Sequence, residues 1–343
     1  GYYTYTENGV TEGVSAVTEV KAAYFAGGFA GAAILPKSNG GWADNMEWLV
    51  KGDHYTVNNA NMTITADAVA GGYYGYYQVC DSIWDTGVEA LYNALAGYRN
   101  DPDALAANLD SVAGGLNVSG ISYNDNSVGN KNAEWVNNLK IELGDGDITT
   151  GAVTAGYWAG GVFGFVPEAQ SMYIKCNTGG VVKTTGSNLM GEGYTYAGGI
   201  TGRTGSRMVL DHCSNTGYIS SNSDYYGSLC EVNRGEISNC EVGFAWFSTD
   251  EKSGHNGPHG YAGGLCGRNE GSISGSFSSA KDNGSHDGTF DVTGGEYVGG
   301  LCGENVSTIK LSDIFHYIIS VDSEQYAGGV CGINKGQIIR DEN

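Results

Sequence analysis

At 343 residues the chain is long enough for two ordinary domains. Its net charge of -21, with only 17 lysines and arginines, makes a nucleic acid or an anionic membrane surface an unfavourable partner. The 57 glycines, 23 tyrosines and only 4 prolines indicate a turn-rich β protein, and the glycines lack the three-residue period of collagen. No apolar run approaches the ~20 residues of a membrane helix, so we expect no membrane insertion. Because an initiator methionine and a signal peptide are missing, we expect Gly1 to be a processed end or the start of an excised segment.

A glycine-rich phrase recurs along the whole chain. Its clearest copy is Tyr-Ala-Gly-Gly-Leu-Cys-Gly at residues 261–267. The first glycine of each pair (Gly-Ser in one copy) falls at positions 27, 71, 114, 160, 198, 227, 263, 299 and 328. Successive copies are therefore 29 (227 minus 198) to 46 (160 minus 114) residues apart. A repeat of this length is typical of a solenoid or a propeller, so we expect one elongated array.

Residues 1–150 carry three long repeats, each with a short helical segment at a similar distance from its glycines. We predict these segments at residues 44–50, 88–95 and 132–139. In the middle repeat, Asp101 and Pro102 are typical of the N-cap and first residue of a further helix, which carries Leu105 and Leu109. We interpret these helices as insertions into one repeated design.

Residues 151–343 lack helical patterns and contain short strand-like segments. After each glycine phrase a second pattern follows, as at residues 235–240, 271–276 and 307–312. Two or three short strands per repeat suit a parallel β-helix, whose coils stack about 4.8 Å apart. A propeller blade needs about 40 or more residues, so the propeller is the weaker alternative. We therefore predict an all-β parallel β-helix in two parts, residues 1–150 and 151–343.

The phrase also predicts which side chains face inward. The Tyr261 and Leu265 positions are apolar in every copy and stand four residues apart, so a regular strand would place both on one face, the core. The Cys266 position has the opposite parity and is more variable. Either the glycine pair bends the strand or a further segment covers this side; we favour the bend.

Residues 264–267 with Arg268 and Asn269, and residues 300–303 with Glu304 and Asn305, resemble the GLUG repeat of bacterial surface and secreted proteins. The resemblance is closest over residues 196–336, where an asparagine recurs at the family's position, namely Asn233, Asn269, Asn305 and Asn334. It implies about nine such repeats and a cell-surface or secreted location. The family includes the non-catalytic repeats of IgA-specific metallopeptidases, but this chain has no His-Glu-x-x-His motif, so protease activity is not implied.

The cysteines fall into two columns. One consists of Cys230, Cys266, Cys302 and Cys331, and the other of Cys176, Cys213 and Cys240, with Cys80 alone. Stacked coils would bring neighbours in a column within the Cα separation of a disulfide. Two interpretations stay open, a buried ladder of free thiols and disulfides between coils.

Two sets of residues suggest metal sites. His255 and His259 lie in one loop and His286 and Asp287 in the corresponding loop of the next repeat, so together they would suit a divalent metal. Ordinary solvated loop histidines are the alternative. Two acidic turns would suit calcium, although plain turns are the alternative. One turn contains Glu142, Asp145 and Asp147, and the other contains Asp101 and Asp103.

Several aromatic residues suggest a platform for sugar rings, namely Trp42, Trp84, Tyr76 and Tyr77. The alternative interpretation is that tryptophans in these segments, such as Trp48 and Trp135, anchor the short helices on the solenoid.

Polysaccharide enzymes with a β-helix fold carry catalytic motifs that this chain matches only in part. The partial matches Asn177-Thr178-Gly179 and Pro258-His259-Gly260 differ from these motifs at the residues that carry out the chemistry. We therefore predict a non-enzymatic extracellular β-solenoid module of a bacterial surface or secreted protein, with an adhesive or scaffolding role. Its partner would be a protein or glycan of a host or neighbouring cell. One alternative is a self-assembling extracellular fibre subunit, because the last repeat at residues 326–336 has no polar cap and would associate end to end. The other alternative is a polysaccharide-active β-helix enzyme.

Overall fold

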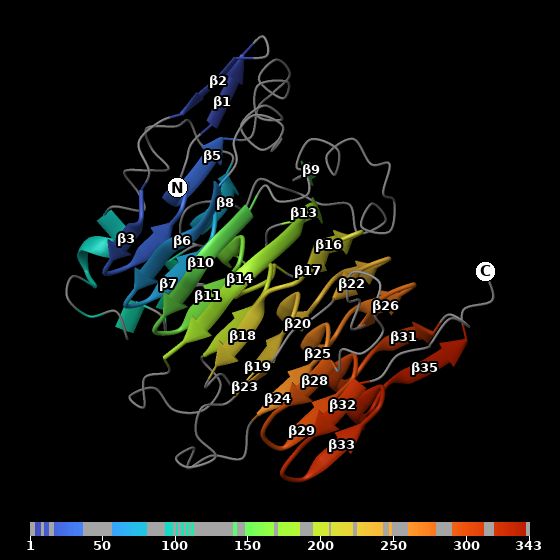
Figure 1. Cartoon of the computed structure of the whole chain (residues 1–343). Helices are drawn as coiled ribbons and strands as arrows, with labels where there is room; N and C mark the ends of the chain where they lie inside the picture. The colour runs from blue at the N-terminus through green and yellow to red at the C-terminus, as the bar shows by residue number, and fades with distance from the viewer. Residues whose placement is uncertain are drawn as a thin grey trace.

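The computed structural model describes residues 4–7, 10–13, 17–36, 57–80, 93–98, 101, 104–105, 108–109, 111–112, 140–142, 148–167, 171–185, 195–205, 207–221, 225–242, 247–248, 260–278, 290–311 and 319–340. These residues form a solenoid of stacked parallel strands that runs from the N-terminal coils to the C-terminal coils (Figure 1). The predicted all-β parallel solenoid is therefore confirmed. Among the described residues, no helix is long and apolar enough to cross a membrane.

The strands of the glycine phrase form an eight-stranded sheet. In stacking order they are β4 (Phe25–Gly27), β7 (Val69–Gly71), β11 (Trp158–Gly160), β15 (Tyr196–Gly198), β19 (Tyr225–Gly227), β24 (Tyr261–Gly263), β29 (Tyr297–Gly299) and β33 (Tyr326–Gly328). Each strand pairs in parallel with the next and in register, so that the same position of every copy lies above its equivalent. The phrase thus repeats once per coil.

After the phrase, each coil continues into a second wall. This wall consists of a three-stranded sheet, β5 (Ala30–Pro36), β8 (Tyr74–Cys80) and β12 (Phe163–Phe165), and a four-stranded sheet, β20 (Cys230–Asn233), β25 (Cys266–Asn269), β30 (Cys302–Asn305) and β34 (Cys331–Asn334). Between them lies only an isolated bridge at Thr201, which pairs with Phe163 and Cys230.

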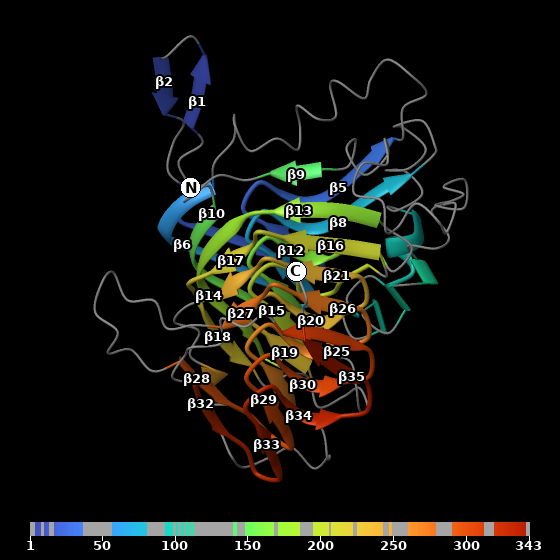
Figure 2. The same ribbon diagram turned by 90° about the vertical axis from the view of Figure 1, so that its right-hand side faces the viewer.

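Two further sheets complete the coils (Figure 2). The seven-stranded sheet contains β9 (Lys140–Glu142), β13 (Ser171–Lys175), β16 (Arg207–Asp211), β21 (Glu236–Ser238), β26 (Ser272–Ser274), β31 (Thr308–Leu311) and β35 (Gln337–Arg340). The nine-stranded sheet contains β3 (Glu19–Ala22), β6 (Val57–Ala66), β10 (Ile148–Ala155), β14 (Asn177–Thr184), β17 (Ser214–Asn215), β18 (Tyr218–Ser221), β22 (Glu241–Val242), β23 (Phe247–Ser248) and β27 (Phe277–Ser278). Smaller pairs are the antiparallel β1 (Thr4–Glu7) and β2 (Val10–Gly13), and the parallel β28 (Phe290–Thr293) and β32 (Ile319–Asp322).

The glycine pair bends the chain, as we predicted. In the clearest copy, β24 ends at Gly263 and β25 begins at Cys266, so a bend separates the two strands. Both Leu265 and Cys266 are fully buried in the core, because the bend turns the side chains of both inward. The bend also interrupts the two-residue alternation that we assumed from residue 261 to residue 265.

The prediction that the Tyr261 column faces the core is therefore wrong. Ala262, not Tyr261, packs in the core with Leu265 and Cys266, and the same holds for its equivalents in the other described coils except Ala327 of the last one, which is exposed. Tyr261 lies on the outer side of the same strand and is only half-buried. The core column consists of Ala26, Ala70, Ala159, Ala197, Tyr226, Ala262 and Val298.

The copy of the phrase at residues 112–116 does not form a coil of this sheet. β7 pairs directly with β11, with Val69 opposite Trp158, so no strand lies between them. Val112 instead belongs to a helical segment and packs with Leu105 and Leu109. In the described part of the chain the phrase sheet thus has eight strands. This is one fewer than the number of coils in the prediction of about nine, because the copy at residues 112–116 adds no strand.

The helical insertion of the middle repeat covers the outer side of the first coils. Asp101 is the N-cap that we predicted, since its Oδ1 accepts a hydrogen bond from the backbone N–H of Ala104 at 2.9 Å. Leu105 and Leu109 are fully buried against the outer cluster that includes Trp158. The segments predicted to be helical at residues 44–50 and 132–139 lie outside the described residues.

The asparagine of each C-terminal coil forms a ladder along the solenoid. The Asn233 amide donates to the Asn269 oxygen at 2.8 Å, Asn269 donates to Asn305 at 2.8 Å, and Asn305 donates to Asn334 at 2.7 Å. Asn233 also donates to the backbone carbonyl of Ser272 at 3.0 Å. A buried amide needs such partners, so this column links successive coils.

The phrase sheet and the second wall approach each other closely at Gly267. A Cβ atom at this position would lie 2.7 Å from the Tyr261 carbonyl oxygen, 2.8 Å from the Tyr226 nitrogen and 2.9 Å from the Glu231 oxygen. All three are backbone atoms, which cannot move independently. We expect Gly267→Ala to lower the free energy of unfolding by about 3 kcal/mol, as measured by urea denaturation.

Gly329→Ala is the matched control for Gly267→Ala. A Cβ atom at Gly329 would meet no atom within 4 Å, although this glycine belongs to the same repeated phrase. We expect its free energy of unfolding to stay close to that of the unsubstituted chain. Equal losses in the two variants would contradict the proposed backbone contact.

Candidate functional site

The predicted sugar platform is wrong for its two described members. Tyr76 and Tyr77 are fully buried, because both sides of β8 are covered. Tyr77 packs in the core against Phe163 with the ring centroids 5.4 Å apart, and Tyr76 stacks on Phe165 at 5.5 Å. Neither ring is open to a ligand.

The other predicted site residues lie outside the described part of the chain. For the metal site these are His255, His259, His286 and Asp287, and for the platform Trp42 and Trp84. Of the acidic turns, Asp101 caps a helix, whereas the side chains of Glu142, Asp103, Asp145 and Asp147 are not described. Within the described residues, no group of three or more histidine, cysteine, aspartate or glutamate side chains is placed to hold a metal ion.

A row of stacked tyrosines follows the outer side of the phrase sheet. We call this row the tyrosine ladder, and it consists of Tyr196, Tyr225, Tyr261, Tyr297 and Tyr326. The last four rings are 4.8, 4.8 and 5.0 Å apart between centroids and within 9° of parallel, while Tyr196 is tilted by 49° to Tyr225. The ladder is half-buried except at Tyr326, which is 50% exposed.

The ladder is the uncovered continuation of a column that is buried elsewhere. In the first coils the same position holds Phe25, Val69 and Trp158, which pack beneath the helical insertion with Leu105 and Leu109. Beyond Tyr196 the tyrosines are half-buried, and Tyr326 is exposed. Burial raises the pKa of Tyr196 and Tyr261 to about 12, so these hydroxyls remain protonated donors at neutral pH.

A row of ion pairs lies beside the tyrosine ladder. Arg268 Nε is 3.1 Å from Glu304 Oε2 and 3.2 Å from Glu270 Oε1, and Lys335 Nζ is 2.7 Å from Glu304 Oε1. Arg234 Nε approaches Glu270 Oε2 at 3.5 Å. Arg268, Glu304 and their partners come from successive coils, so each charge faces an opposite charge above or below. We call this row, with Arg203 and Glu231, the charge ladder.

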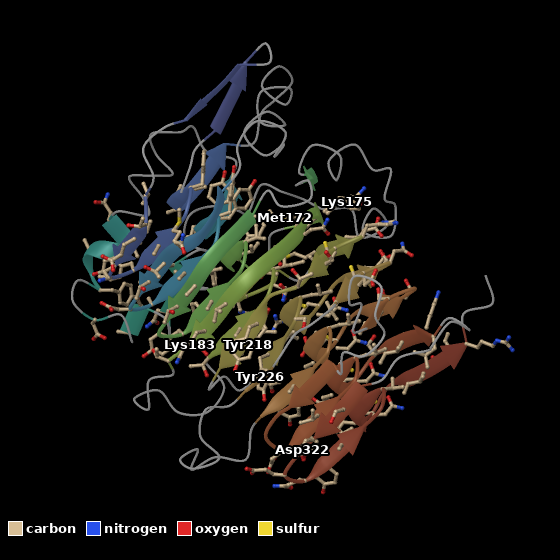
Figure 3. All side chains as sticks on the ribbon, in the orientation of Figure 1. Met172, Lys175, Lys183, Tyr218, Tyr226 and Asp322 are labelled. Atoms are coloured by element: carbon tan, nitrogen blue, oxygen red, sulfur yellow. The ribbon has the colours of Figure 1, made fainter. Side chains whose placement is uncertain are left out.

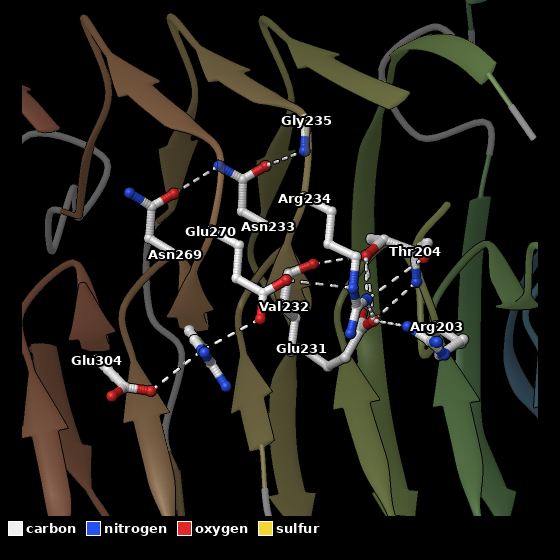
Figure 4. A network of polar contacts seen from close by, with 11 residues as sticks. Arg203, Thr204, Glu231, Val232, Asn233, Arg234, Gly235, Asn269, Glu270 and Glu304 are labelled. Atoms are coloured by element: carbon white, nitrogen blue, oxygen red, sulfur yellow. Dashed lines mark hydrogen bonds and ion pairs between the residues drawn. The ribbon is translucent and has the colours of Figure 1, made fainter. Parts of the chain in front are cut away.

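The N-terminal end of the charge ladder is buried. The Glu231 side chain is fully buried and lies 3.2 Å from Arg234 and 3.8 Å from Arg203 (Figure 4). It also accepts a hydrogen bond from the backbone N–H of Thr204 at 2.8 Å. Burial raises the pKa of Glu231, and the two arginines act in the opposite direction. The Arg203 guanidinium carbon lies 5.7 Å from the Tyr196 ring centroid, within range of a cation–π contact.

The arrangement of the two ladders suits binding rather than bond cleavage. The charges are paired with one another, so they provide no base that is poised to take a proton from a substrate. The tyrosine edges provide apolar area and hydroxyl donors in a row along the solenoid axis. Sequence analysis missed both ladders as surface features. The charge ladder could have been predicted from Arg268 and Glu304, which carry opposite charges at the same position, immediately before the recurring asparagine.

A second polar cluster, also missed, lies at the corner between the seven-stranded and nine-stranded sheets. The Asp211 carboxylate accepts hydrogen bonds from Tyr173 at 2.6 Å, Ser238 at 2.8 Å and Asn239 at 2.9 Å, and His212 Nδ1 is 3.1 Å away. Burial acts to raise the pKa of Asp211, but these hydrogen bonds outweigh it and hold the pKa well below its usual range. The cluster joins three successive coils.

The predicted cysteine columns are confirmed as stacks. Cys230, Cys266, Cys302 and Cys331 pair in register, and Cys240 Sγ lies 3.4 Å from the backbone N–H of Cys213 in the second column. The described cysteines are free thiols, and burial raises the pKa of those in the core, such as Cys230 and Cys240. The side chain of Cys80 lies outside the described residues.

Comparisons with known proteins add no relative. The chain matches no protein-family model, no curated protein and no solved structure. The resemblance to GLUG repeats therefore stays a prediction that rests on the phrase and the asparagine column.

We expect Asp211→Asn to destabilise the fold at neutral pH and not at low pH. Because the pKa of Asp211 is lower in the folded chain, its ionised form stabilises the fold above the ordinary aspartate pKa of about 4, and this contribution is lost as the pH falls through the lowered value. We expect a loss of about 2 kcal/mol at pH 7 that shrinks steadily below about pH 4, measured by urea denaturation across this range.

Asp322→Asn is the matched control, because Asp322 is exposed at the C-terminal end of the solenoid (Figure 3). We expect only a small change in stability for this variant. A loss in Asp211→Asn that persists undiminished at low pH would show that the charge of Asp211 is not what stabilises the corner.

Proposed function

We propose that the chain is a non-enzymatic β-solenoid module of a bacterial surface or secreted protein, with an adhesive or scaffolding role outside the cell. One observation carries this proposal: the polar and reactive side chains of the described coils are bound to neighbouring coils. Asp211, Glu231 and the asparagine ladder each join residues of successive coils. Such residues stabilise a long repeat structure, whereas catalysis needs groups that exchange protons or bonds with a substrate.

The tyrosine ladder is the adhesive surface that this proposal favours. It extends along the solenoid where the helical insertion no longer covers the column. Tyrosine combines a large apolar ring with a hydroxyl group and is enriched at binding interfaces. The partner we propose is a protein or glycan on the surface of a host or neighbouring cell.

We expect beads coated with the chain to adhere to glycan-bearing surfaces or cells in a saturable manner, with free chain competing. The double variant Tyr225→Ala and Tyr261→Ala should reduce retention at least tenfold, because it removes two adjacent rings from the interior of the ladder. Retention is measured by counting fluorescent beads after washing. Tyr218→Ala should leave retention unchanged, because this half-buried tyrosine (labelled in Figure 3) lies on β18 of the nine-stranded sheet and not on the phrase sheet that carries the ladder.

Two results would contradict the proposal. One is undiminished retention of the double variant, which would remove the ladder from adhesion. The other is cleavage of an acidic or neutral polysaccharide by the chain, with or without calcium, that a single substitution abolishes, since this would make the chain an enzyme.

A second candidate function, a self-assembling fibre subunit, is favoured by the last described coil. Tyr326, Ile338 and Ile339 are the exposed large apolar side chains of the described structure, at 50%, 37% and 43%. Ile338 lies in register with the fully buried Ile309, so it continues the core column. A second copy stacked on this coil would bury Ile338 as each coil buries its predecessor.

We expect the chain to form concentration-dependent oligomers in analytical ultracentrifugation if it assembles in this way. Ile338→Lys should abolish them, because it places a charge at the end of the core column. Ile339→Lys is the matched control, since Ile339 is in register with the outward-facing Lys310. A strict monomer at high concentration would exclude this second function.

A further inference from the structure

The cysteine column that follows the glycine pairs ends in Cys302 and Cys331, two residues that differ in their exposure to solvent. Cys230, Cys266 and Cys302 are fully buried, whereas Cys331 in the last described coil is half-exposed. Cys331 pairs in register with Cys302 across β30 and β34. A buried thiol therefore lies directly beside one that solvent and small solutes reach.

The two thiols of this pair contact each other and are chemically unequal. The Cys302 thiol donates a hydrogen bond to the Cys331 sulfur, which lowers the pKa of Cys331. The same hydrogen bond, together with burial, raises the pKa of Cys302. A half-exposed thiol whose pKa is lowered forms the attacking thiolate more readily than its buried neighbour does, and the neighbour is then in place to complete the exchange.

The spacing of the coils allows a bond between these sulfurs. Neighbouring strands lie about 4.8 Å apart, within the 4.4 to about 6.8 Å between Cα atoms that a disulfide accepts. In-register side chains point the same way, so closing the bond needs a small shift of one coil. Within the described structure, the coil of Cys331 has a neighbour on one side only, whereas the coils of Cys230 and Cys266 are held on both sides.

We propose that Cys302 and Cys331 are a thiol oxidation site that closes to an intramolecular disulfide when the chain meets a small disulfide such as oxidised glutathione. The Cys331 thiolate attacks one glutathione sulfur, forms a mixed disulfide and releases one glutathione thiolate. Cys302 then gives its proton to the released glutathione thiolate, attacks the Cys331 sulfur and releases the second glutathione as a thiolate, which takes up from solvent the proton that Cys331 had lost. Two protein thiols are oxidised and one glutathione disulfide is reduced to two thiols.

The bond would fix the last coil to its predecessor. That coil presents the unpaired edges of β33, β34 and β35 and the exposed Ile338. Besides the continuous backbone, only non-covalent contacts described in the structure hold it to its predecessor, among them the parallel pairing of β34 with β30 and the side-chain contacts of Asn334 and Lys335. The disulfide would thus make the stability of this end depend on the redox state, and this inference does not require that the chain be adhesive or fibrous.

The test uses the full chain, reduced, freed of reductant and incubated with oxidised glutathione. We expect the number of thiols titrated after denaturation to fall by two from the eight of the chain. Peptide mass spectrometry after alkylation should place the new bond between Cys302 and Cys331. Amide hydrogen exchange over residues 326–340 should slow severalfold on oxidation, because the last coil opens less often.

Three variants separate the steps of the reaction. Cys302→Ala should stop at a glutathione adduct on Cys331, because no neighbouring thiol completes the exchange. Cys331→Ala should show no oxidation, and Cys230→Ala, in the same column but buried, should still form the bond. An unchanged thiol count, a stable glutathione adduct on the unsubstituted chain, or a bond mapped to any other cysteines would overturn the proposal. The mapping uses the unsubstituted chain, so it holds even if a variant does not fold.

Discussion

The structure depends on the close approach of two walls of backbone at a column of glycines. At Gly267 and Gly303 a Cβ atom would lie 2.7 Å from the carbonyl oxygen of Tyr261 and Tyr297 respectively, and Gly164, Gly202 and Gly332 show comparable contacts. The phrase strand and the strand that follows it can therefore pack together only without a side chain between them. This constraint explains why the glycines recur while the loops between copies vary in length, because the walls must meet in every coil but the connections need not be equal.

In-register stacking then decides which side chains each column tolerates. Every residue lies above its equivalent, so a column must consist of groups that interact well with copies of themselves. An asparagine amide is both donor and acceptor, which lets Asn233, Asn269, Asn305 and Asn334 form one continuous chain of hydrogen bonds. Tyrosine rings and thiols also stack on their own kind. A charged group does not, so the position of Arg268 carries Glu304 in the next coil and Val232 in the previous one.

Much of the architecture followed from the sequence, because repetition is visible there without knowledge of packing. The parallel stack, the bend at the glycine pair, the cysteine columns and the Asp101 cap were predicted correctly. The face of the tyrosines was predicted wrongly, since the bend resets the alternation between Tyr261 and Leu265 and the sequence does not reveal by how much. Burial of Tyr76 was missed because it depends on a helical insertion that folds back over the sheet. Burial of Tyr77 was missed because the direction in which it faces the core depends on the course of the chain after the bend. The copy at residues 112–116 had the composition of a coil but lies partly in a helix, so local similarity was overridden by tertiary packing.

Among the described coils, the phrase that departs from the glycine column supports the same constraint. In register, Glu231 stands where the next coils have Gly267 and Gly303, a position where a side chain would strike the preceding coil. The preceding coil is irregular here: beyond the isolated bridge at Thr201 residues 202–205 form no strand, although Gly202 and Arg203 still form backbone hydrogen bonds with the coil before. The space is filled by the Glu231 carboxylate, which replaces the missing strand contacts with Thr204, Arg203 and Arg234. A lone buried carboxylate would be strongly unfavourable, and the two arginines offset its burial. The irregular coil and the glutamate therefore compensate for each other. Replacing Glu231 by glycine would remove the carboxylate that Arg203 and Arg234 share, instead of restoring a regular repeat.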